Sequence, residues 1–409
     1  MQSKRLKKAL QITLGIVTSV GGFLEIGSIT TAAQAGAAFG YQLLWAILLG
    51  TICLIFLVEM SGRLAAVSKH TIVDLTRERF GFPFFFIVLV GVVLVAFLVL
   101  VAELGGIALS FQLLTGVRFP WWAIPVSLAV WLLMWKGTFG LIENGVSLLG
   151  LITISFIVAA IKLHPDWSAA ASGLLPGMPK NDKAHYGFLA VSILGASISP
   201  YLMYFYSSGA IEDEWDESYI PVNRFVALLG MSFGGLLSMG VLIAAALALK
   251  PKGIPVDTFD QAAQLMTAAF PRWGVYLFAF SMMFACLGAA LEISLAIAYF
   301  FAQGFGWNWS ENLMPANNAR FSFTYTIIIM LGAVPLLFAV DPINVTVISM
   351  ALTAATLPLA IVPFLFLMND SRYLGEHRNG WLSNTVVAII ILISFVLAVI
   401  SIPLQIMGS

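Results

Sequence analysis

Apolar residues form long runs along the whole chain, and short polar stretches separate these runs. A helix of about 20 mainly apolar residues crosses the hydrocarbon core of a bilayer, whereas membrane barrels show shorter, alternating segments. The eleven runs of spanning length cover residues 10–37, 42–61, 83–114, 119–135, 142–163, 187–209, 224–249, 273–304, 321–340, 344–368 and 382–405. The pattern therefore predicts an all-α polytopic membrane protein with about 11 transmembrane helices, the third and eighth of them long enough to be tilted.

The composition supports the same fold class. Hydrophobic residues make up 60% of the chain, charged residues make up 10%, and the mean hydropathy is +0.97. Soluble domains contain roughly a quarter charged residues, so an ordinary soluble domain is excluded. Cys53 and Cys286 both fall within apolar runs, which predicts neither a disulfide scaffold nor a Cys/His metal cluster. The net charge of zero and the lack of a basic face give no reason to expect a nucleic-acid partner.

Basic residues predict how the chain is oriented. If the N-terminal group of Lys4, Arg5, Lys7 and Lys8 lies in the cytoplasm, 13 of the 20 basic residues fall inside and 7 fall outside. The positive-inside rule then favours a cytoplasmic N-terminus and, with an odd number of spans, an external C-terminus. We expect an integral protein of a bacterial inner or plasma membrane. No linker interrupts the spans, so residues 1–409 are expected to form one integral domain.

Three carboxylates lie well inside apolar runs: Glu25 in the first run, Glu103 in the third and Glu292 in the eighth. A charge at the bilayer centre costs from about 2.5 kcal/mol upward, so each is a candidate functional residue. Glu103 and Glu292 have two readings. Each is either an accessory acid that adds charge or accepts a proton, or a structural glutamate packed between helices.

Two of the runs also carry helix-breaking signals. In the first run, Glu25 is surrounded by Gly21, Gly22, Gly27 and Ser28. In the sixth run, LGASISPYLMY (194–204) places Pro200 in mid-span, where it removes a main-chain donor and clashes with the carbonyl of Ala196. These runs correspond in two halves of five helices, about 10–163 and 187–368, with an extra helix at 382–405. Transporters built from inverted repeats bind substrate where two such broken helices face each other.

The residues at the two breaks offer mainly oxygen ligands. Glu25 supplies a negative charge, Ser28 and Ser199 supply hydroxyls, and the unwound main chain supplies carbonyls. The candidate substrate-binding residues are Glu25, Gly27, Ser28, Ala196, Ser199 and Tyr201, of which Glu25, Ser28, Ala196 and Ser199 are the candidate metal ligands. Such hard ligands suit Mg²⁺, Ca²⁺ or Mn²⁺ better than softer metals, although an organic cation is compatible with them too.

The sequence resembles the NRAMP family of divalent-metal transporters. The matching stretches are QAGAAFGYQLLW (34–45), ELGGIALSFQLLTG (103–116), HPDW (164–167), LGASISPY (194–201) and LPLAIVPFLFLMND (357–370). The resemblance covers nearly the full length and implies a LeuT-like arrangement of two inverted five-helix repeats with discontinuous helices 1 and 6. It also implies a transported divalent cation as the ligand and no separate cofactor, and it leaves the oligomeric state open.

The family's functional motifs are altered in this chain. Its D-P-G-N motif falls on Glu25-Ile26-Gly27-Ser28, its M-P-H motif on Ser199-Pro200-Tyr201, its next histidine on Tyr206, its third-span acids on Leu100 and Glu103, and its tenth-span glutamine on Met350. The charge at the first break is kept, but the sixth-span thioether and both sixth-span histidines are missing. By position along the sixth span, Tyr201 and Tyr206 are both expected to face the break.

These departures change the expected chemistry. Without the sixth-span thioether, the reason to prefer transition metals over Mg²⁺ weakens. Without the histidines, few groups near the breaks titrate close to neutral pH, which predicts weak or absent proton coupling. The Q-A-G-A and I-S-P-Y strings resemble the NRAMP-related branch of Mg²⁺/Mn²⁺ transporters. We therefore expect transport of Mg²⁺ or Mn²⁺ by alternating access, with a transporter of a small organic cation or zwitterion, or a transport-inactive receptor, as the alternatives.

Overall fold

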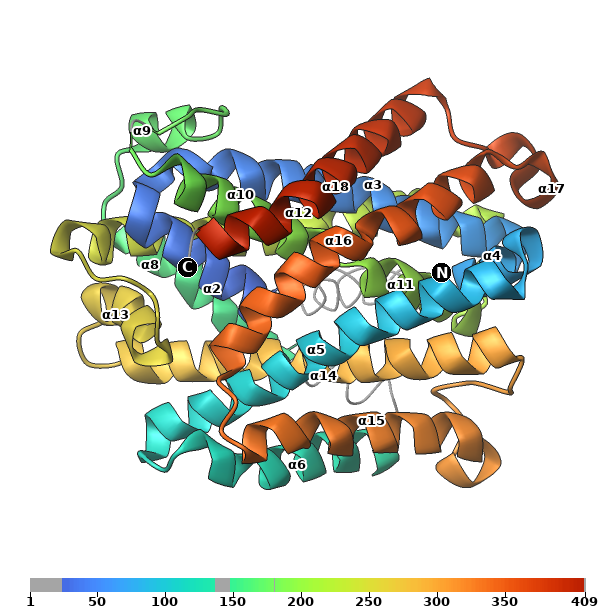
Figure 1. Ribbon diagram of the computed structural model, residues 1–409, viewed down its shortest axis with the longest axis horizontal. Coiled ribbons are helices and arrows are strands. Elements are labelled where there is room, and N and C mark those ends of the chain that lie inside the picture. The colour runs from blue at the N-terminus through green and yellow to red at the C-terminus, as the bar shows by residue number, and fades with distance from the viewer. Residues whose placement is uncertain (1–23, 137–147, 180, 408–409) are drawn as a thin grey trace, which may run out of the picture.

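A computed structural model describes residues 24–136, 148–179 and 181–407, and these residues form helices and connecting loops without a strand (Figure 1). The α-helices are α2 (Ile26–Phe39), α3 (Leu44–Ser68), α4 (Ile72–Phe80), α5 (Phe82–Thr115), α6 (Ala123–Lys136), α8 (Ile154–Lys162), α9 (Trp167–Ser172), α10 (Lys183–Ser197), α11 (Pro200–Glu212), α12 (Ile220–Ala248), α13 (Phe259–Ala269), α14 (Gly274–Phe305), α15 (Ala319–Leu337), α16 (Pro342–Asn369), α17 (Ser371–Leu374) and α18 (Trp381–Met407). The predicted all-α class is confirmed.

The predicted spans correspond to these helices. Within the described residues, 7 helical segments are long and apolar enough to cross a membrane, and Leu148–Lys162 and Trp381–Val396 form shorter apolar helices. The start of the first predicted span, residues 10–23 with Gly21 and Gly22, lies outside the described residues. The start of the fifth, residues 142–147, lies outside them as well.

The sixth predicted span is interrupted where the sequence places its proline. Helix α10 ends at Ser197 and α11 begins at Pro200, with Ile198 (φ −112°, ψ 66°) and Ser199 (φ −78°, ψ 118°) outside the helical region between them. Pro200 has no N–H to continue the ladder, and it occupies the first helical position, where none is needed. The predicted discontinuity of this span is confirmed.

Helix α2 begins at Ile26, beside the predicted first break. Glu25 precedes it in an extended conformation (φ −118°, ψ 169°), and its carbonyl accepts the first helical hydrogen bond from the Ile29 N–H at 3.1 Å. Helix α2 packs against α10 and α12, and α16 contacts both α2 and α10. The start of α2 and the break in the sixth span are therefore enclosed by other helices.

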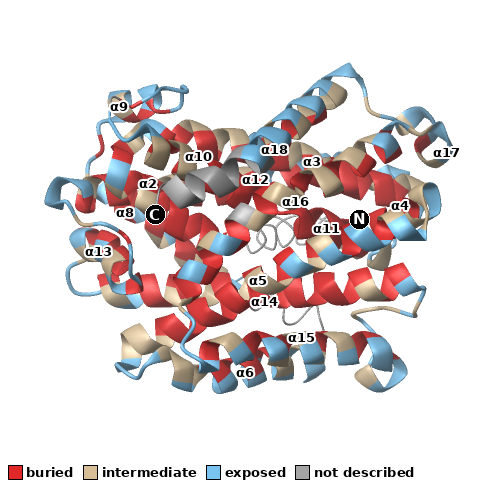
Figure 2. Cartoon of the chain, viewed as in Figure 1, coloured by how far each residue is buried: buried red, intermediate tan, exposed pale blue. Residues whose placement is uncertain are grey.

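Long helices cross the centre of the molecule, and a helix pair lies at its edge. Helices α5 and α14 pack against each other along the middle, whereas α6 and α15 lie side by side at one edge (Figure 1). Large apolar residues are exposed on these outer helices, among them Leu128, Leu132, Phe323 and Leu331. Figure 2 colours parts of α6 and α15 as exposed. An extensive exposed apolar surface marks a membrane-facing region, as expected for an integral membrane protein.

One end of the bundle is held by basic side chains. Arg63 of α3 contacts Glu59 at 3.0 Å, and Arg224 of α12 contacts the same carboxylate at 3.2 Å. Arg79 of α4 contacts Asp370, at the end of α16, at 3.4 Å. All three arginines belong to loops or helix ends predicted to lie inside. Their gathering at one end agrees with that prediction, while the direction of the chain across a membrane stays a prediction.

Candidate functional site

The main chain around Glu25 is fixed by Ser28. The Glu25 N–H donates to Ser28 Oγ at 3.0 Å, and the Ser28 hydroxyl donates back to the Glu25 carbonyl at 2.9 Å. Both residues are buried, with Glu25 1% exposed and Ser28 5% exposed. The first of these bonds satisfies an N–H group that a helix start leaves without a main-chain acceptor. Ser28, which the sequence proposes as a ligand, therefore also sets the direction in which the Glu25 side chain leaves the chain.

Helix α5 brings a second carboxylate to the same helix start. Glu103 is fully buried, and its Oε1 and Oε2 accept from the Ile26 N–H at 3.1 and 3.4 Å. The N-terminus of a helix carries a partial positive charge, which stabilises carboxylates placed there. The sequence marks Glu103 only as an accessory acid and gives no sign of this main-chain contact, because the contact joins segments 77 residues apart.

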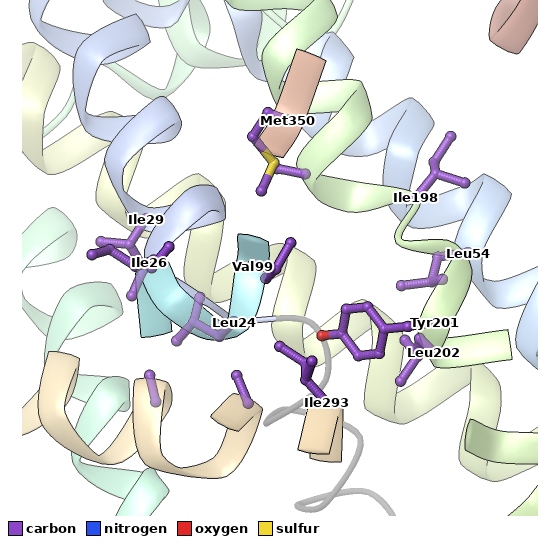
Figure 3. Close-up of a cluster of buried hydrophobic side chains, with 14 of the residues drawn as sticks. Leu24, Ile26, Ile29, Leu54, Val99, Ile198, Tyr201, Leu202, Ile293 and Met350 are labelled. Atoms are coloured by element: carbon purple, nitrogen blue, oxygen red, sulfur yellow. The ribbon is translucent and has the colours of Figure 1, made fainter. Parts of the chain in front are cut away.

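The sixth-span break faces Glu25 through Tyr201. This residue is 1% exposed, and its hydroxyl donates to Glu25 Oε2 at 3.4 Å. Figure 3 shows the Tyr201 hydroxyl pointing from α11 toward the start of α2. Within the break, Ser199 Oγ donates to the Ala196 carbonyl at 3.4 Å, and that carbonyl cannot receive a main-chain bond from Pro200. The structure thus brings Tyr201 of the sixth-span break to Glu25, and Ser199 and Ala196 are buried within the same break.

One oxygen of the Glu25 carboxylate has no hydrogen-bond partner among the described residues. Glu25 Oε1 is buried and accepts no hydrogen bond from any residue that the structure describes. A buried carboxylate oxygen without a donor is costly, and a bound cation is the kind of ligand that satisfies it. No group of three or more His, Cys, Asp or Glu side chains is placed to hold a metal ion in the described part of the chain.

Two further residues considered from the sequence, Glu292 and Tyr206, lie on different sides of this region. Glu292 is buried on α14, next to Ile293, which Figure 3 shows beside Tyr201. The expectation that Tyr206 faces the break is wrong, because its hydroxyl donates to Asn223 Oδ1 at 3.1 Å on α12. Five residues along a helix correspond to a rotation of roughly 140°, so Tyr201 and Tyr206 point to different faces.

The sequence did not predict that Met350 packs against the start of α2. This residue lies on α16, is 2% exposed, and contacts Gly27 in the first turn of α2. Its thioether lies between α2 and the sixth-span break in Figure 3. The signal was present in the resemblance, since the tenth-span glutamine of the family falls on this position, but an apolar residue at that position gave no reason to keep it.

Relatives of this chain are found along nearly its whole length. A family model described as Natural resistance-associated macrophage protein-like (Nramp) matches residues 15–403. The divalent metal cation transporter MntH of Deinococcus radiodurans is 27% identical over 394 residues, covering 92% of this chain and 86% of the relative. The protein of the same name from Klebsiella pneumoniae subsp. pneumoniae is 25% identical, covering 90% of this chain and 89% of the relative.

Solved structures share the fold. The manganese transporter of Eremococcus coleocola superposes with a TM-score of 0.80 at 21% identity, covering 97% of this chain and 86% of that chain. Mhp1, a nucleobase-cation-symport-1 family transporter, superposes with a TM-score of 0.61 at 15% identity, covering 97% and 92%. These likenesses confirm the predicted LeuT-like architecture. Because the family model also covers nearly all of the sequence, this chain belongs to the Nramp family.

Proposed function

We propose that this protein transports a divalent cation, with Mg²⁺ or Mn²⁺ favoured, by alternating access around the region between the start of α2 and the α10–α11 break. The observation that carries the proposal is the buried Glu25 carboxylate, whose Oε1 has no partner among the described residues, at the junction of these segments. The names of the relatives agree with it, since two are called divalent metal cation transporters and one is called a manganese transporter.

Each residue has a distinct part in this proposal. Glu25 neutralises the cation, since an uncompensated charge at membrane depth costs several kcal/mol. The Ala196 carbonyl and the Ser199 hydroxyl bind the ion or its waters from the sixth-span break, as hard ligands do for Mg²⁺ and Mn²⁺. Ser28 holds the main chain of Glu25, and the Tyr201 hydroxyl donates to the Oε2 of its carboxylate.

The break supplies the flexibility that alternating access requires. Ile198 and Ser199 separate α10 from α11, so the two half-helices can change their mutual angle at these two residues. Cation binding at the break then couples the position of α11 to that of α2. Transporters with inverted repeats use such rocking of one helix group against another around a fixed site.

Proton coupling is proposed to be weak. Tyr201 and Tyr206 stand where the family has histidines, and Tyr206 faces α12 instead of the site. Purified protein in liposomes that contain a pH-sensitive dye tests this directly. We expect Mn²⁺ uptake without matching acidification of the lumen, and acidification in step with uptake would contradict the proposal.

Thermal stabilisation by cations tests the site itself. Wild-type protein and the Glu25→Gln variant are heated in Mg²⁺, Mn²⁺, Ca²⁺, Cd²⁺ and a set of amines, with Glu376→Gln, an exposed acid, as the matched control. Stabilisation by metals in the wild type and the control, but not in Glu25→Gln, supports the proposal. Equal stabilisation of all three proteins contradicts the site, a response to amines alone favours an organic-cation transporter, and no response to any ligand favours a receptor.

A further inference from the structure

Helix α8 carries an exposed apolar stripe. Ile154, Val158 and Ile161 are exposed, and their spacing of four and three residues places them on one face of the helix. On the opposite face Phe156 and Ala159 are buried, and α8 packs against α12 and α13. In an integral membrane protein, an exposed apolar stripe of this kind contacts the acyl chains of the bilayer.

The stripe leads into a pocket at the C-terminal end of α8. The pocket has a volume of about 460 Å³, which is in the range of small-molecule sites. Figure 1 shows α8, α9 and α13 at the same end of the molecule. The lining residues come from the end of α8, the loop after it and the first residue of α9: Val158, Ile161, Lys162, His164, Pro165 and Trp167. The pocket is therefore apolar along the helix and basic where the helix ends.

Lys162 and His164 supply the basic end of the pocket. Lys162 is the last residue of α8, and its Nζ lies 4.6 Å from the centroid of the Phe270 ring, a contact that holds the ammonium in place. The six described residues that line the pocket include no acid. The carboxylate of Asp166 is engaged elsewhere, since its Oδ1 accepts from two N–H groups at the start of α9 at 2.9 and 3.1 Å. The basic end therefore attracts an anion.

Trp167 indicates the depth of this basic end in the membrane. It is exposed and is the first residue of α9. Tryptophan is enriched at the interface between hydrocarbon and water, and lysine side chains near helix ends extend toward the same layer. The fifth predicted span, 142–163, ends at this point of the chain. The pocket thus joins a stripe at the depth of acyl chains to a basic end at the depth of lipid headgroups.

We propose that this pocket binds an anionic phospholipid. The lipid phosphate accepts from the Lys162 ammonium and the His164 ring N–H, and an acyl chain lies along Ile161 and Val158. A zwitterionic lipid binds less tightly, because its quaternary ammonium is repelled by the same lysine. Free phosphate binds less tightly, because it has no acyl chain to cover the stripe. The inference does not depend on the transport function proposed above.

Native mass spectrometry of the full chain, titrated with phosphatidylglycerol or phosphatidylcholine, measures the binding. Wild type should bind phosphatidylglycerol more tightly. Lys162→Gln should weaken phosphatidylglycerol binding about fivefold, the factor expected for one basic side chain beside anionic headgroups, and should leave phosphatidylcholine binding unchanged. Lys162→Arg should retain the preference. The matched control is Lys252→Gln, which removes an exposed lysine predicted to lie on the same side of the membrane and should match wild type.

Two further measurements test the apolar part of the site. Val158→Ser should weaken the binding of both lipids, whereas Leu331→Ser, which changes an exposed apolar residue of α15, should not. Soluble glycerol phosphate should not displace bound phosphatidylglycerol. Equal binding of the two lipids by wild type, unchanged phosphatidylglycerol binding in Lys162→Gln or in Val158→Ser, or displacement by glycerol phosphate would each overturn the proposal. The last result would instead indicate a site for free phosphate.

Discussion

Replacing Arg63 by methionine is expected to destabilise the protein strongly. Arg63 is 4% exposed, and its guanidinium donates to three groups on two segments. Its Nε and Nη2 donate to the Glu59 carboxylate at 3.0 and 3.1 Å, its Nη2 also donates to Asn379 Oδ1 at 2.9 Å, and its Nη1 donates to the His377 carbonyl. Methionine retains the apolar stem but removes the guanidinium from all of these acceptors, of which only Glu59 keeps another arginine, Arg224.

The size of the effect follows from what the acceptors retain. Removing one partner of a buried ion pair typically costs about 3–5 kcal/mol, because the other charge is left uncompensated. Here the Glu59 side chain is 14% exposed and retains Arg224 at 3.2 Å, so we expect the lower end, about 3 kcal/mol. Domains of 150–250 residues lose about 2–4 °C in Tm per kcal/mol, and a longer chain loses less. The Tm should therefore fall by roughly 5 °C.

Thermal unfolding in detergent, followed by tryptophan fluorescence, measures this difference. The matched control is Arg224→Met, which removes the other partner of the same carboxylate. The Arg224 side chain is 64% exposed, so its loss should cost less than about 1 kcal/mol. Adding Glu59→Leu to Arg63→Met should restore part of the Tm, since no buried charge is then left unpaired. Equal Tm values for the two single arginine variants would refute the reasoning.

Three further predictions concern the helix start, a close helix contact and the orientation. Glu103→Leu leaves the first amide of α2 without an acceptor and should cost about 1–3 kcal/mol, whereas Glu103→Gln keeps an acceptor; equal melting of the two would contradict the contact. Gly36→Ala places a Cβ 2.2 Å from a main-chain carbonyl of α12 and should lower Tm, while Gly209→Ala, with open space around it, should not. A cysteine introduced at Lys252 should react with an impermeant maleimide added outside intact cells, and a cysteine introduced at Arg378 should react only after permeabilisation. The native cysteines are buried and should give little background labelling. The reverse labelling pattern would show the opposite orientation.

The architecture was predictable because it depends on patterns local to the sequence. Long apolar runs predict the helices. A proline in mid-span interrupts the main-chain hydrogen bonds of a helix, as Pro200 does at the start of α11. The site was predictable only in part. Glu25 stood out as a charge in an apolar run, but the Ser28 bonds to its main chain and the Glu103 contact depend on how segments pack. The contact between Met350 and Gly27 was not predictable, because a methionine in an apolar helix gives no polar signal of what it packs against.

The hydrogen bond between Glu103 and the Ile26 amide links the first turn of α2 to α5. Any rotation or sliding of α2 past α5 has to break this hydrogen bond, at a cost of about 1–3 kcal/mol if the buried amide is left without an acceptor. The free-energy cost of moving α2 relative to α5 therefore includes breaking a hydrogen bond of the Ile26 main-chain amide. A ligand bound to Glu25 therefore acts on the residue next to the hydrogen bond that has to break.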